Sequence, residues 1–376
     1  MSYKNIYILG VGGSGMSSIA KYLKQKGDNV IGYDQRKSYV TNLLNQDGIK
    51  VVHTLDEITY NPESLYIYSS AIPIESDRFE DFHDKENVLS RPEYLKNLSE
   101  NHKIIGITGT HGKTSTTALL SHIFHFNNVN VSYLYGGITT FNGIGGHYGD
   151  PDQPLILETD EAFNTFEKIK ISDLLVLNVD SDHLDYFKNL DNYKDAFYKV
   201  MKNVTDNLVI NNDDLNIKSM KELKNPVSYG KDIAADFKVQ SPGTFIYENN
   251  KYEIKSDIIG DHFKSNMLGA IILAFLNGIE IKDSLNAIES FAGVKRRIEL
   301  IGISKGVLIY DDYGHHPTEM EATITALKQQ TESKLYVVFQ PHRYTRTMEY
   351  FNSFKDSLKL ADFAIVTDIY LSLIHI

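Results

Sequence analysis

The sequence predicts an α/β protein built from three consecutive domains. With 376 residues, the chain has room for about two to three domains of ordinary size. Short apolar strand patterns alternate with helical patterns along its whole length, and a new strand–loop–helix unit begins after a polar stretch. We therefore expect domains at residues 1–100, 101–292 and 293–376.

The first domain is expected to be Rossmann-like. Residues 5–9 have the apolar pattern of a buried strand, a glycine-rich turn follows, and residues 16–26 have a helical pattern. Residues 29–33 and 64–70 continue the alternation as two further strands. The pattern fades in the polar stretch 97–103, where we place the first boundary.

The second domain repeats this arrangement and is expected to resemble a P-loop ATPase. Residues 104–108 form a predicted strand that leads into a second glycine loop and a helix over 113–126. The other predicted elements of this domain are strands at 155–158, 174–179 and 207–210 and a helix at 265–278.

The third domain is predicted to be an incomplete Rossmann-like α/β unit. Its predicted elements are strands at 307–310, 334–340 and 363–367, with helices at 318–329 and 348–360 between them. Because the pattern stops after three strands, we expect the end of this domain to be missing from the chain.

Composition excludes several classes of protein. The net charge of -11 argues against a general nucleic-acid-binding protein, which needs a cationic surface. The absence of cysteine excludes thiol catalysis and thiolate metal sites. The first ten residues do not form a secretory signal, and the longest apolar stretch, 267–279, is too short to span a bilayer. We therefore expect a cytoplasmic protein with no nucleic-acid or membrane partner.

The loop after the first strand carries the pattern G-x-G-x-x-G. Glycines at Gly10, Gly12 and Gly15 let backbone N–H groups at a helix N-terminus approach a pyrophosphate. Asp34 ends the next predicted strand, where a dinucleotide-binding domain places its ribose-binding acid. From these residues alone, an NAD dehydrogenase and a tight turn without a ligand both remain open.

The loop after strand 104–108 has the residues of a triphosphate site. It consists of Gly109, Thr110, His111, Gly112, Lys113, Thr114 and Ser115. In such a loop the backbone amides bind phosphate oxygens, the lysine contacts the outer phosphates, and the hydroxyl of Thr114 binds Mg²⁺. The loop is shorter than a strict Walker A motif, since Ile107 stands where that motif has its first glycine.

Two potential metal ligands follow other strands of the second domain. Glu158 ends the predicted strand 155–158, and His183 follows the predicted strand 174–179. Because strand carboxyl ends gather at the ligand-binding edge of an α/β sheet, we expect both side chains to face the Lys113 loop. Together with Thr114, they are the predicted Mg²⁺ ligands.

The third domain carries basic and acidic side chains near its predicted strands. Arginines at strand ends suit bidentate binding of phosphate or carboxylate. The candidates are Arg297, Asp312, His315, His342, Arg343 and Arg346.

These motifs together resemble those of the Mur ligase family, which acts in peptidoglycan precursor synthesis, over nearly the whole chain. The runs 311–319 and 340–347 resemble most closely the members that add L-alanine to UDP-N-acetylmuramate. The resemblance implies a three-domain Mur ligase architecture, ATP and Mg²⁺ as cofactors, and UDP-N-acetylmuramate and L-alanine as substrates.

The resemblance also implies roles for individual residues. It makes the first loop a UDP-sugar site rather than an NAD site, with ligands Gly10, Gly12, Gly13, Ser14, Gly15, Met16, Asp34, Ser69, Ser70, Arg91, His342, Arg343 and Arg346. It implies ATP binding by the loop 109–115, with Arg297 on a phosphate and Asp312 on the ribose. The residues it implies as catalytic are Lys113, His183 and His315. Phe263 departs from the family, which often has an asparagine facing the adenine there.

A ligase of this kind is expected to activate a carboxylate. Phosphoryl transfer from ATP converts the lactyl carboxylate into an acyl phosphate, which the amine of L-alanine then attacks. The alternatives are a sibling ligase that attaches a recycled tripeptide, a truncated product that only binds the UDP-sugar, and an NAD oxidoreductase. The last would leave Lys113, Glu158 and His183 unused. Because the third domain ends early, we expect this chain to bind UDP-N-acetylmuramate but to turn it over poorly.

Overall fold

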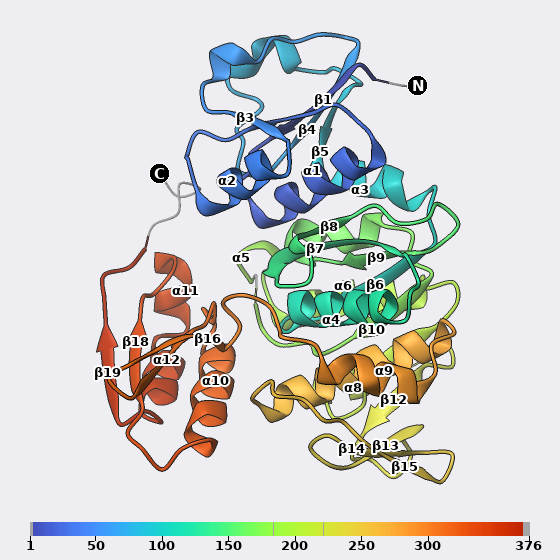
Figure 1. Cartoon of the computed structure of the whole chain (residues 1–376), viewed down its shortest axis with the longest axis vertical. Helices are drawn as coiled ribbons and strands as arrows, with labels where there is room; N and C mark the ends of the chain where they lie inside the picture. Colours follow the sequence, from blue (N-terminus) through green and yellow to red (C-terminus); the bar gives the residue numbers. More distant parts are fainter. Residues whose placement is uncertain (1–2, 183, 221, 371–376) are drawn as a thin grey trace.

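The chain forms three units in the order of the sequence. The computed structural model describes residues 3–182, 184–220 and 222–370. The first unit lies at one end of the molecule, the central unit follows it, and the third unit flanks the central one (Figure 1). Parallel sheets with helical connections dominate the first two units, so the predicted α/β class is confirmed.

The first unit is a five-stranded parallel sheet of order β3-β2-β1-β4-β5. The order reverses at β1, so the loop after β1 lies at the topological switch point, where open α/β sheets bind ligands. The strands are β1 (Asn5–Leu9), β2 (Val30–Tyr33), β3 (Lys50–Val52), β4 (Ser64–Tyr68) and β5 (Val88–Ser90). The helices are α1 (Ser14–Lys26), α2 (Tyr39–Gln46) and α3 (Arg91–Ser99), with 3₁₀ segments η1 (Leu55–Glu57) and η2 (Asp77–Phe82).

The central unit is a ten-stranded mixed sheet of order β15-β14-β13-β12-β11-β10-β6-β9-β7-β8. Its middle strands are parallel, and β6 is buried along its whole length, as in a sheet covered on both faces. The first strands are β6 (Ile104–Thr108), β7 (Ser132–Thr139), β8 (Gly143–His147), β9 (Leu155–Glu158) and β10 (Asp173–Val176). The others are β11 (Leu208–Asn211), β12 (Val227–Gly230), β13 (Phe237–Ser241), β14 (Thr244–Tyr247) and β15 (Asn250–Glu253). The helices are α4 (Lys113–Phe126), η3 (Ala162–Lys168), α5 (Leu184–Phe187), α6 (Leu190–Lys202), α7 (Leu215–Lys218), α8 (Asp261–Leu276) and α9 (Ile281–Glu289).

The third unit has two separate pairs of strands in place of the single three-stranded unit that we expected. β16 (Glu299–Ser304) pairs antiparallel with β17 (Val307–Asp311), and β18 (Tyr336–Phe339) pairs parallel with β19 (Phe363–Val366). Lys305 and Gly306 both have positive φ, 50° and 81°, the backbone of a tight hairpin turn that folds β17 back onto β16. The helices are α10 (Pro317–Gln329), α11 (Tyr344–Glu349) and α12 (Phe351–Leu358).

Several predicted elements have different bounds in the structure. The helix expected over 348–360 is divided into α11 and α12, because Tyr350 between them has φ -104° and ψ 20°. The helix expected at 265–278 begins at Asp261. The strand expected over 174–179 ends at Val176, and the residues after it form a loop beside the second glycine loop.

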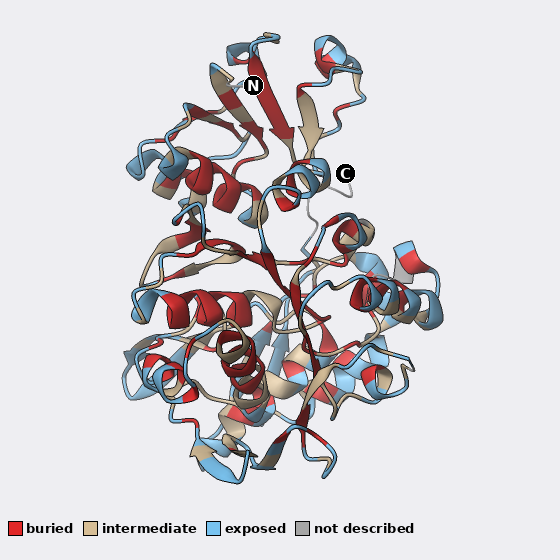
Figure 2. Cartoon of the chain, turned by 90° about the vertical axis from the view of Figure 1, so that its right-hand side faces the viewer, coloured by how far each residue is buried: buried red, intermediate tan, exposed pale blue. Residues whose placement is uncertain are grey.

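The first and central units share one hydrophobic cluster. It joins α1 and the β1 sheet to β7, β8 and η3, and includes Ile8, Ile19, Leu134, Ile144 and Phe166. Figure 2 shows the buried residues concentrated on the strands and on the helix faces that pack against them in both units. The third unit has a separate, small cluster of Met320, Phe339 and Phe354.

The contact between α1 and β8 is close. Gly146 permits it, since a Cβ at that position would lie 2.1 Å from the backbone oxygen of Ser18. Lys21 adds a charged group to the same contact, and its Nζ donates a hydrogen bond to the carbonyl of Ile144 at 3.3 Å. The first unit is therefore fixed on the central one.

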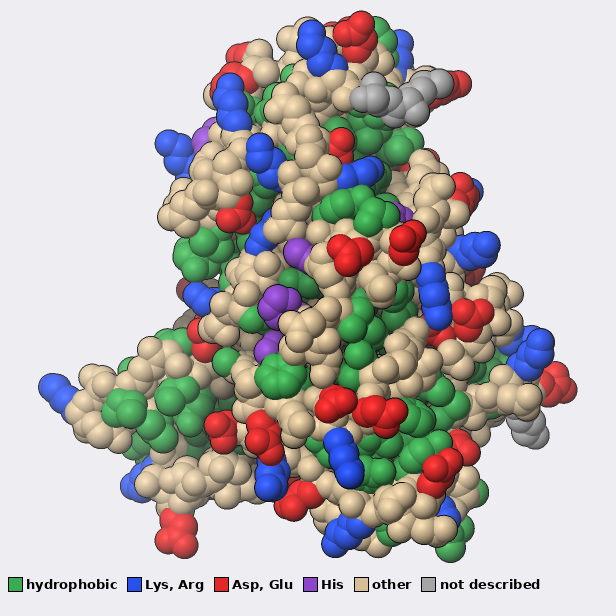
Figure 3. Space-filling view, turned by 45° about the vertical axis from the view of Figure 1, so that its right-hand side comes forward, with side chains coloured by type: hydrophobic (Ala, Val, Ile, Leu, Met, Phe, Trp, Pro, Cys, Tyr) green, Lys and Arg blue, Asp and Glu red, His purple; other side chains and the backbone are tan. Residues whose placement is uncertain are grey.

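The described helices include none that is long and apolar enough to cross a membrane. On the face shown in Figure 3, lysine and arginine side chains are interspersed with acidic ones.

Candidate active site

Asp34 supports the first glycine loop from inside. Gly10 follows β1 with φ 82°, and the N–H of Gly12 donates a hydrogen bond to Oδ2 of Asp34 at 2.9 Å. A Cβ at Gly12 would lie 2.7 Å from the same oxygen, so a larger residue there would displace the Asp34 carboxylate. Neither Gly10 nor Asp34 is among the residues that line the three cavities described below. A direct contact of Asp34 with UDP-sugar stays a prediction.

A cavity of about 420 Å³ lies between the first and central units. Arg91, at the start of α3, reaches over the helix that follows the glycine loop, and a Cβ at Gly15 would lie 2.8 Å from its Nε. This Nε is buried and has no hydrogen-bond partner in the described part of the chain. A buried donor without an acceptor is costly, which favours an anionic ligand at this point. The lining includes the predicted ligands Gly13, Ser14, Gly15, Met16, Ser69, Ser70 and Arg91.

The second glycine loop holds the side chain of Lys113 close to its own backbone. Its Nζ donates to the carbonyls of Gly109, at 2.6 Å, and Thr110, at 3.1 Å. The same Nζ lies 2.9 Å from Oε2 of Glu161, a carboxylate that is 1% exposed. Burial alone would lower the pKa of Lys113, but the nearby charges of Glu161, Asp160 and Glu158 raise it above its ordinary value. Lys113 is therefore a fixed cation at the start of α4.

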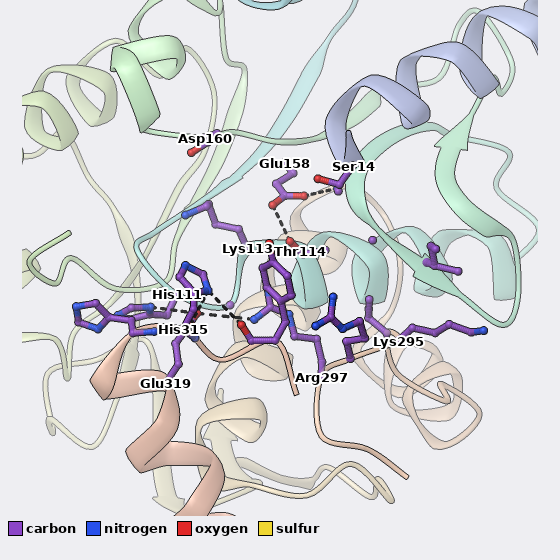
Figure 4. A pocket seen from close by; sticks show the side chains of 18 of the residues that line it. Ser14, His111, Lys113, Thr114, Glu158, Asp160, Lys295, Arg297, His315 and Glu319 are labelled. Atoms are coloured by element: carbon purple, nitrogen blue, oxygen red, sulfur yellow. Dashed lines mark hydrogen bonds and ion pairs between the residues drawn. The ribbon is translucent and has the colours of Figure 1, made fainter. Parts of the chain in front are cut away.

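Thr114 and Glu158 meet at the start of α4, as predicted from strand topology. The Thr114 hydroxyl donates to Oε1 of Glu158 at 2.7 Å, and the N–H of Gly136 donates to Oε2 at 2.6 Å. Figure 4 shows Glu158 pointing toward Thr114 beside Lys113. A hydroxyl and a carboxylate oxygen at this separation form the oxygen donor set that Mg²⁺ prefers. The third predicted ligand, His183, lies outside the described residues.

His111 bridges the central unit and the third unit. Its Nε2 lies 3.1 Å from Oδ2 of Asp180, and its Nδ1 lies 3.4 Å from Oε1 of Glu319 on α10. Burial would lower the pKa of His111, but hydrogen bonds and charges from the two carboxylates raise it to about 9. The imidazole is therefore protonated on both nitrogens at neutral pH.

Other polar contacts hold the third unit against the loop that follows β10. The Thr318 hydroxyl donates to Oδ2 of Asp180 at 2.8 Å, and Tyr350 donates to the carbonyl of Ser181 at 2.9 Å. Arg346, only 8% exposed, lies 3.2 Å from Oδ1 of Asp182. These described contacts with the loop are thus two hydrogen bonds and an ion pair.

The adjacent residues His315 and His316 have different hydrogen-bond partners. In His315, Nδ1 donates to the carbonyl of Tyr313 at 3.1 Å and lies 3.4 Å from Oε2 of Glu319. Both neighbours are acceptors, so Nδ1 carries the proton and Nε2 keeps a free lone pair. In His316, Nδ1 accepts from the N–H of Thr318 and caps α10. Burial lowers the pKa of both, that of His316 to about 4.

A second cavity, of about 400 Å³, is lined by residues of all three units. Gly12 and Ser14 come from the first unit, and Lys113 and Glu158 from the central one. Basic and imidazole groups of the third unit surround the same space, as Figure 4 shows for Lys295, Arg297 and His315. This cavity shares Ser14, Gly136, Glu158 and Asp160 with the cavity at Arg91, so the two spaces adjoin.

Arg297 and Asp312 lie at a further cavity, of about 460 Å³, beside the second glycine loop. The carboxylate of Asp312 accepts hydrogen bonds from the N–H groups of Ile298, at 2.8 Å, and Gly314, at 2.7 Å. Ser115 and Phe263 line this cavity as well. His111 and Gly112 of the second glycine loop line it too.

The structure does not bring every predicted residue to a cavity. His342, Arg343 and Arg346 are absent from the lining of the two adjoining cavities, and Arg346 contacts Asp182 instead.

Conversely, Glu161 and Glu319 were not predicted. The acidic run 158–161 was a signal for Glu161, and the three-residue spacing from His316, which the structure shows as a capping box, was a signal for Glu319.

Three family models match the chain in succession. They are the Mur ligase family catalytic domain over residues 5–103, the Mur ligase middle domain over 107–274 and the Mur ligase glutamate ligase domain over 296–371.

Curated and solved relatives agree with these matches. The chain is 36% identical to the UDP-N-acetylmuramate–L-alanine ligase of Caldicellulosiruptor bescii, over 97% of this chain and 83% of that protein. It is 35% identical to the ligase of the same name from Clostridium botulinum, with 98% and 83% covered. Its structure is similar to that of the UDP-N-acetylmuramate–alanine ligase of Thermotoga maritima, with a TM-score of 0.82, 26% identity, and 97% and 85% covered. On this evidence, the chain belongs to the Mur ligase family.

Proposed function

We propose that this protein joins L-alanine to the lactyl carboxylate of UDP-N-acetylmuramate, with hydrolysis of ATP, in peptidoglycan precursor synthesis. The observation that carries the proposal is the cavity in which Lys113 and Glu158 meet His315 and Arg297 of the third unit. That cavity adjoins the Arg91 cavity, which supports transfer from a bound nucleotide to a bound UDP-sugar. The names of the similar ligases supply the identity of the two substrates.

In this proposal, Lys113 and Arg297 stabilise the charge that develops during phosphoryl transfer. Both are cations that line the same cavity, and phosphoryl transfer depends on positioned positive charge more than on covalent help from the protein. Mg²⁺, held by Thr114 and Glu158, would neutralise phosphate charge at the loop. The lactyl carboxylate would attack the γ-phosphorus to give an acyl phosphate and ADP.

His315 is proposed as the base for the second step. The alanine amine must lose a proton as it attacks the acyl phosphate and expels phosphate. With its proton on Nδ1, His315 offers the Nε2 lone pair to the cavity, and its lowered pKa keeps it neutral at neutral pH. The division of the chain at residues 100 and 292 and a cytoplasmic location remain part of the proposal.

The proposed reaction predicts which amine supports phosphate release. With ATP, Mg²⁺ and UDP-N-acetylmuramate, we expect release when L-alanine is added and little release with glycine, L-serine or no amine. A phosphate-release assay with each amine measures this directly. Preference for a tripeptide over L-alanine would assign the chain to the sibling activity instead, and binding of the UDP-sugar in calorimetry without any turnover would favour a binding-only product.

Loss of the Glu158 carboxylate is expected to raise the Mg²⁺ requirement. In Glu158→Ala, the hydroxyl of Thr114 would lose its 2.7 Å partner, and one oxygen donor of the proposed metal site would be gone. We expect half-maximal activity at a Mg²⁺ concentration ~10-fold higher or more, the lower end of what loss of a metal-site partner costs. The exposed Glu167 provides a matched control as Glu167→Ala, and an unchanged Mg²⁺ titration for Glu158→Ala would exclude it as a ligand.

A further inference from the structure

Glu319 is the point at which several charged groups of the site meet, and no reaction step above uses it. One oxygen, Oε1, lies 3.4 Å from Nδ1 of His111 and 3.7 Å from the guanidinium of Arg297. The other, Oε2, accepts from the backbone N–H of His315 at 3.0 Å and lies 3.4 Å from its Nδ1. Figure 4 shows His111, His315 and Glu319 close together, with Arg297 nearby.

The carboxylate stays ionised although its side chain is only 14% exposed. Burial would raise the pKa of Glu319, but the hydrogen bond and charge of His111 and the charge of Arg297 lower it well below its ordinary value. A buried charge of this kind is retained only when several donors satisfy it, and removal of the charge leaves those donors facing one another. The ionised state of Glu319 is therefore sensitive to the positions of His111, His315 and Arg297.

Glu319 and the side chains that contact it belong to different units. His111 is part of the second glycine loop, and a pair of hydrogen bonds to Asn178, at 2.8 and 2.9 Å, fixes its backbone. Glu319 and His315 belong to the third unit. The contact between Glu319 and His111 therefore exists only while the third unit lies against the second glycine loop. The contact between Glu319 and His315 lies within the third unit.

We propose that Glu319 is a positioning residue that aligns the base His315 with the second glycine loop. Its carboxylate contacts the Nδ1–H of His315, so that Nε2 faces the cavity. The same carboxylate contacts His111 and so joins His315 to the second glycine loop. This inference rests on the proposed ligase function and adds a residue and a coupling to it. Orientation of a catalytic imidazole by a carboxylate on its other nitrogen is a general way to set its tautomer and basicity.

The first test is Glu319→Gln, which keeps the shape of the side chain and removes the charge. We expect turnover to fall at least ~10-fold, as is usual when the partner behind a functional histidine is lost. The KM for UDP-N-acetylmuramate is expected to change less than ~2-fold, since its cavity lies at Arg91. Glu321→Gln, an exposed acid on the same helix, is the matched control and should leave turnover unchanged.

The pH profile separates positioning from a general structural role. The groups that face His315 are Glu319 and the carbonyl of Tyr313, which raise its pKa, Arg346, which lowers it, and Asp182, which raises it. Without the charge of Glu319, the pKa of His315 should fall further, so the acid limb of the rate profile should move to lower pH while the maximum falls. Loss of turnover with an unmoved acid limb, or turnover within ~2-fold of the unaltered protein, would overturn the proposal.

A second variant and a spectroscopic measurement keep the test independent of folding and of the assay. His111→Gln removes the link to the second glycine loop but keeps Glu319 beside His315, so turnover should fall while the acid limb of the rate profile stays in place.

In the unaltered protein, ¹⁵N shifts of the His111 imidazole should show a cation that persists above neutral pH, because its pKa is raised to about 9. Titration of His111 near its ordinary pKa of ~6.5 would refute the bridge. Absence of phosphate release by the unaltered protein would instead refute the proposed function.

Discussion

Lys113→Ala is expected to lower turnover by at least ~10²-fold, because it removes a preorganised cation from the place where phosphate charge develops. In the structure the ammonium group of Lys113 contacts Glu161 and the loop carbonyls, so it is already held at the start of α4. Initial rates of phosphate release with saturating L-alanine measure the effect. The exposed Lys168 supplies a matched control as Lys168→Ala, which should keep full turnover.

The same variant is expected to lose stability as well, for a separate reason. Glu161 is 1% exposed, and removal of its cationic partner leaves a buried carboxylate, at a cost of about 3–5 kcal/mol. The double variant Lys113→Ala with Glu161→Gln should regain most of the thermal stability but none of the turnover. Recovery of turnover in the double variant would show that instability, and not the missing cation, caused the loss.

His315→Gln should lower turnover by ~10² to 10⁴-fold, the range expected when a general base is removed. Glutamine keeps a polar side chain of similar reach but accepts no proton at neutral pH. Since burial lowers the pKa of His315 below its ordinary value, activity of the unaltered protein should be lost only as the pH falls through that lowered pKa. In the variant, this acid limb should disappear from the residual rate.

A separate measurement of the two chemical steps identifies the step that His315 serves. Formation of the acyl phosphate requires no base for the amine, so isotope exchange between ADP and ATP in the presence of UDP-N-acetylmuramate should persist in His315→Gln. If that exchange is lost together with ligation, His315 acts in phosphoryl transfer or in domain docking, and its assignment as the base is wrong.

The parts of the fold that the sequence predicted well are those in which local pattern and tertiary environment agree. The apolar run of β6 and the helix α4 have the expected bounds because a buried strand and a glycine loop that leads into a helix both leave a local signature. The position of Glu158 beside Thr114 also followed from topology, since strand carboxyl ends meet at one edge of a parallel sheet. The metal-binding and catalytic roles of these residues stay predictions.

The features that the sequence did not predict depend on contacts between units. Nothing in the local pattern around Arg346 indicates that its guanidinium contacts Asp182, because the two residues are 164 positions apart. Glu319 was missed for the same reason: its spacing from His316 indicates only a helix start, whereas its contacts with His111 and Arg297 require the third unit to be docked. The turn at Lys305 and Gly306 pairs β17 with β16, and β16 was not predicted from the sequence.

The shared hydrophobic cluster of the first two units determines how the chain should respond to heat. Because one apolar interior runs from the β1 sheet through α1 into β7 and β8, those units are expected to melt as a single cooperative transition. Among the described residues, the hydrophobic cluster that lies within the third unit is the small one around Met320. Hydrogen bonds and an ion pair join this unit to the central one, so we expect it to unfold separately and at a lower temperature. Partial unfolding would thus detach His315 while leaving the UDP-sugar cavity intact, and protein that has lost activity on mild heating could still retain its sugar nucleotide.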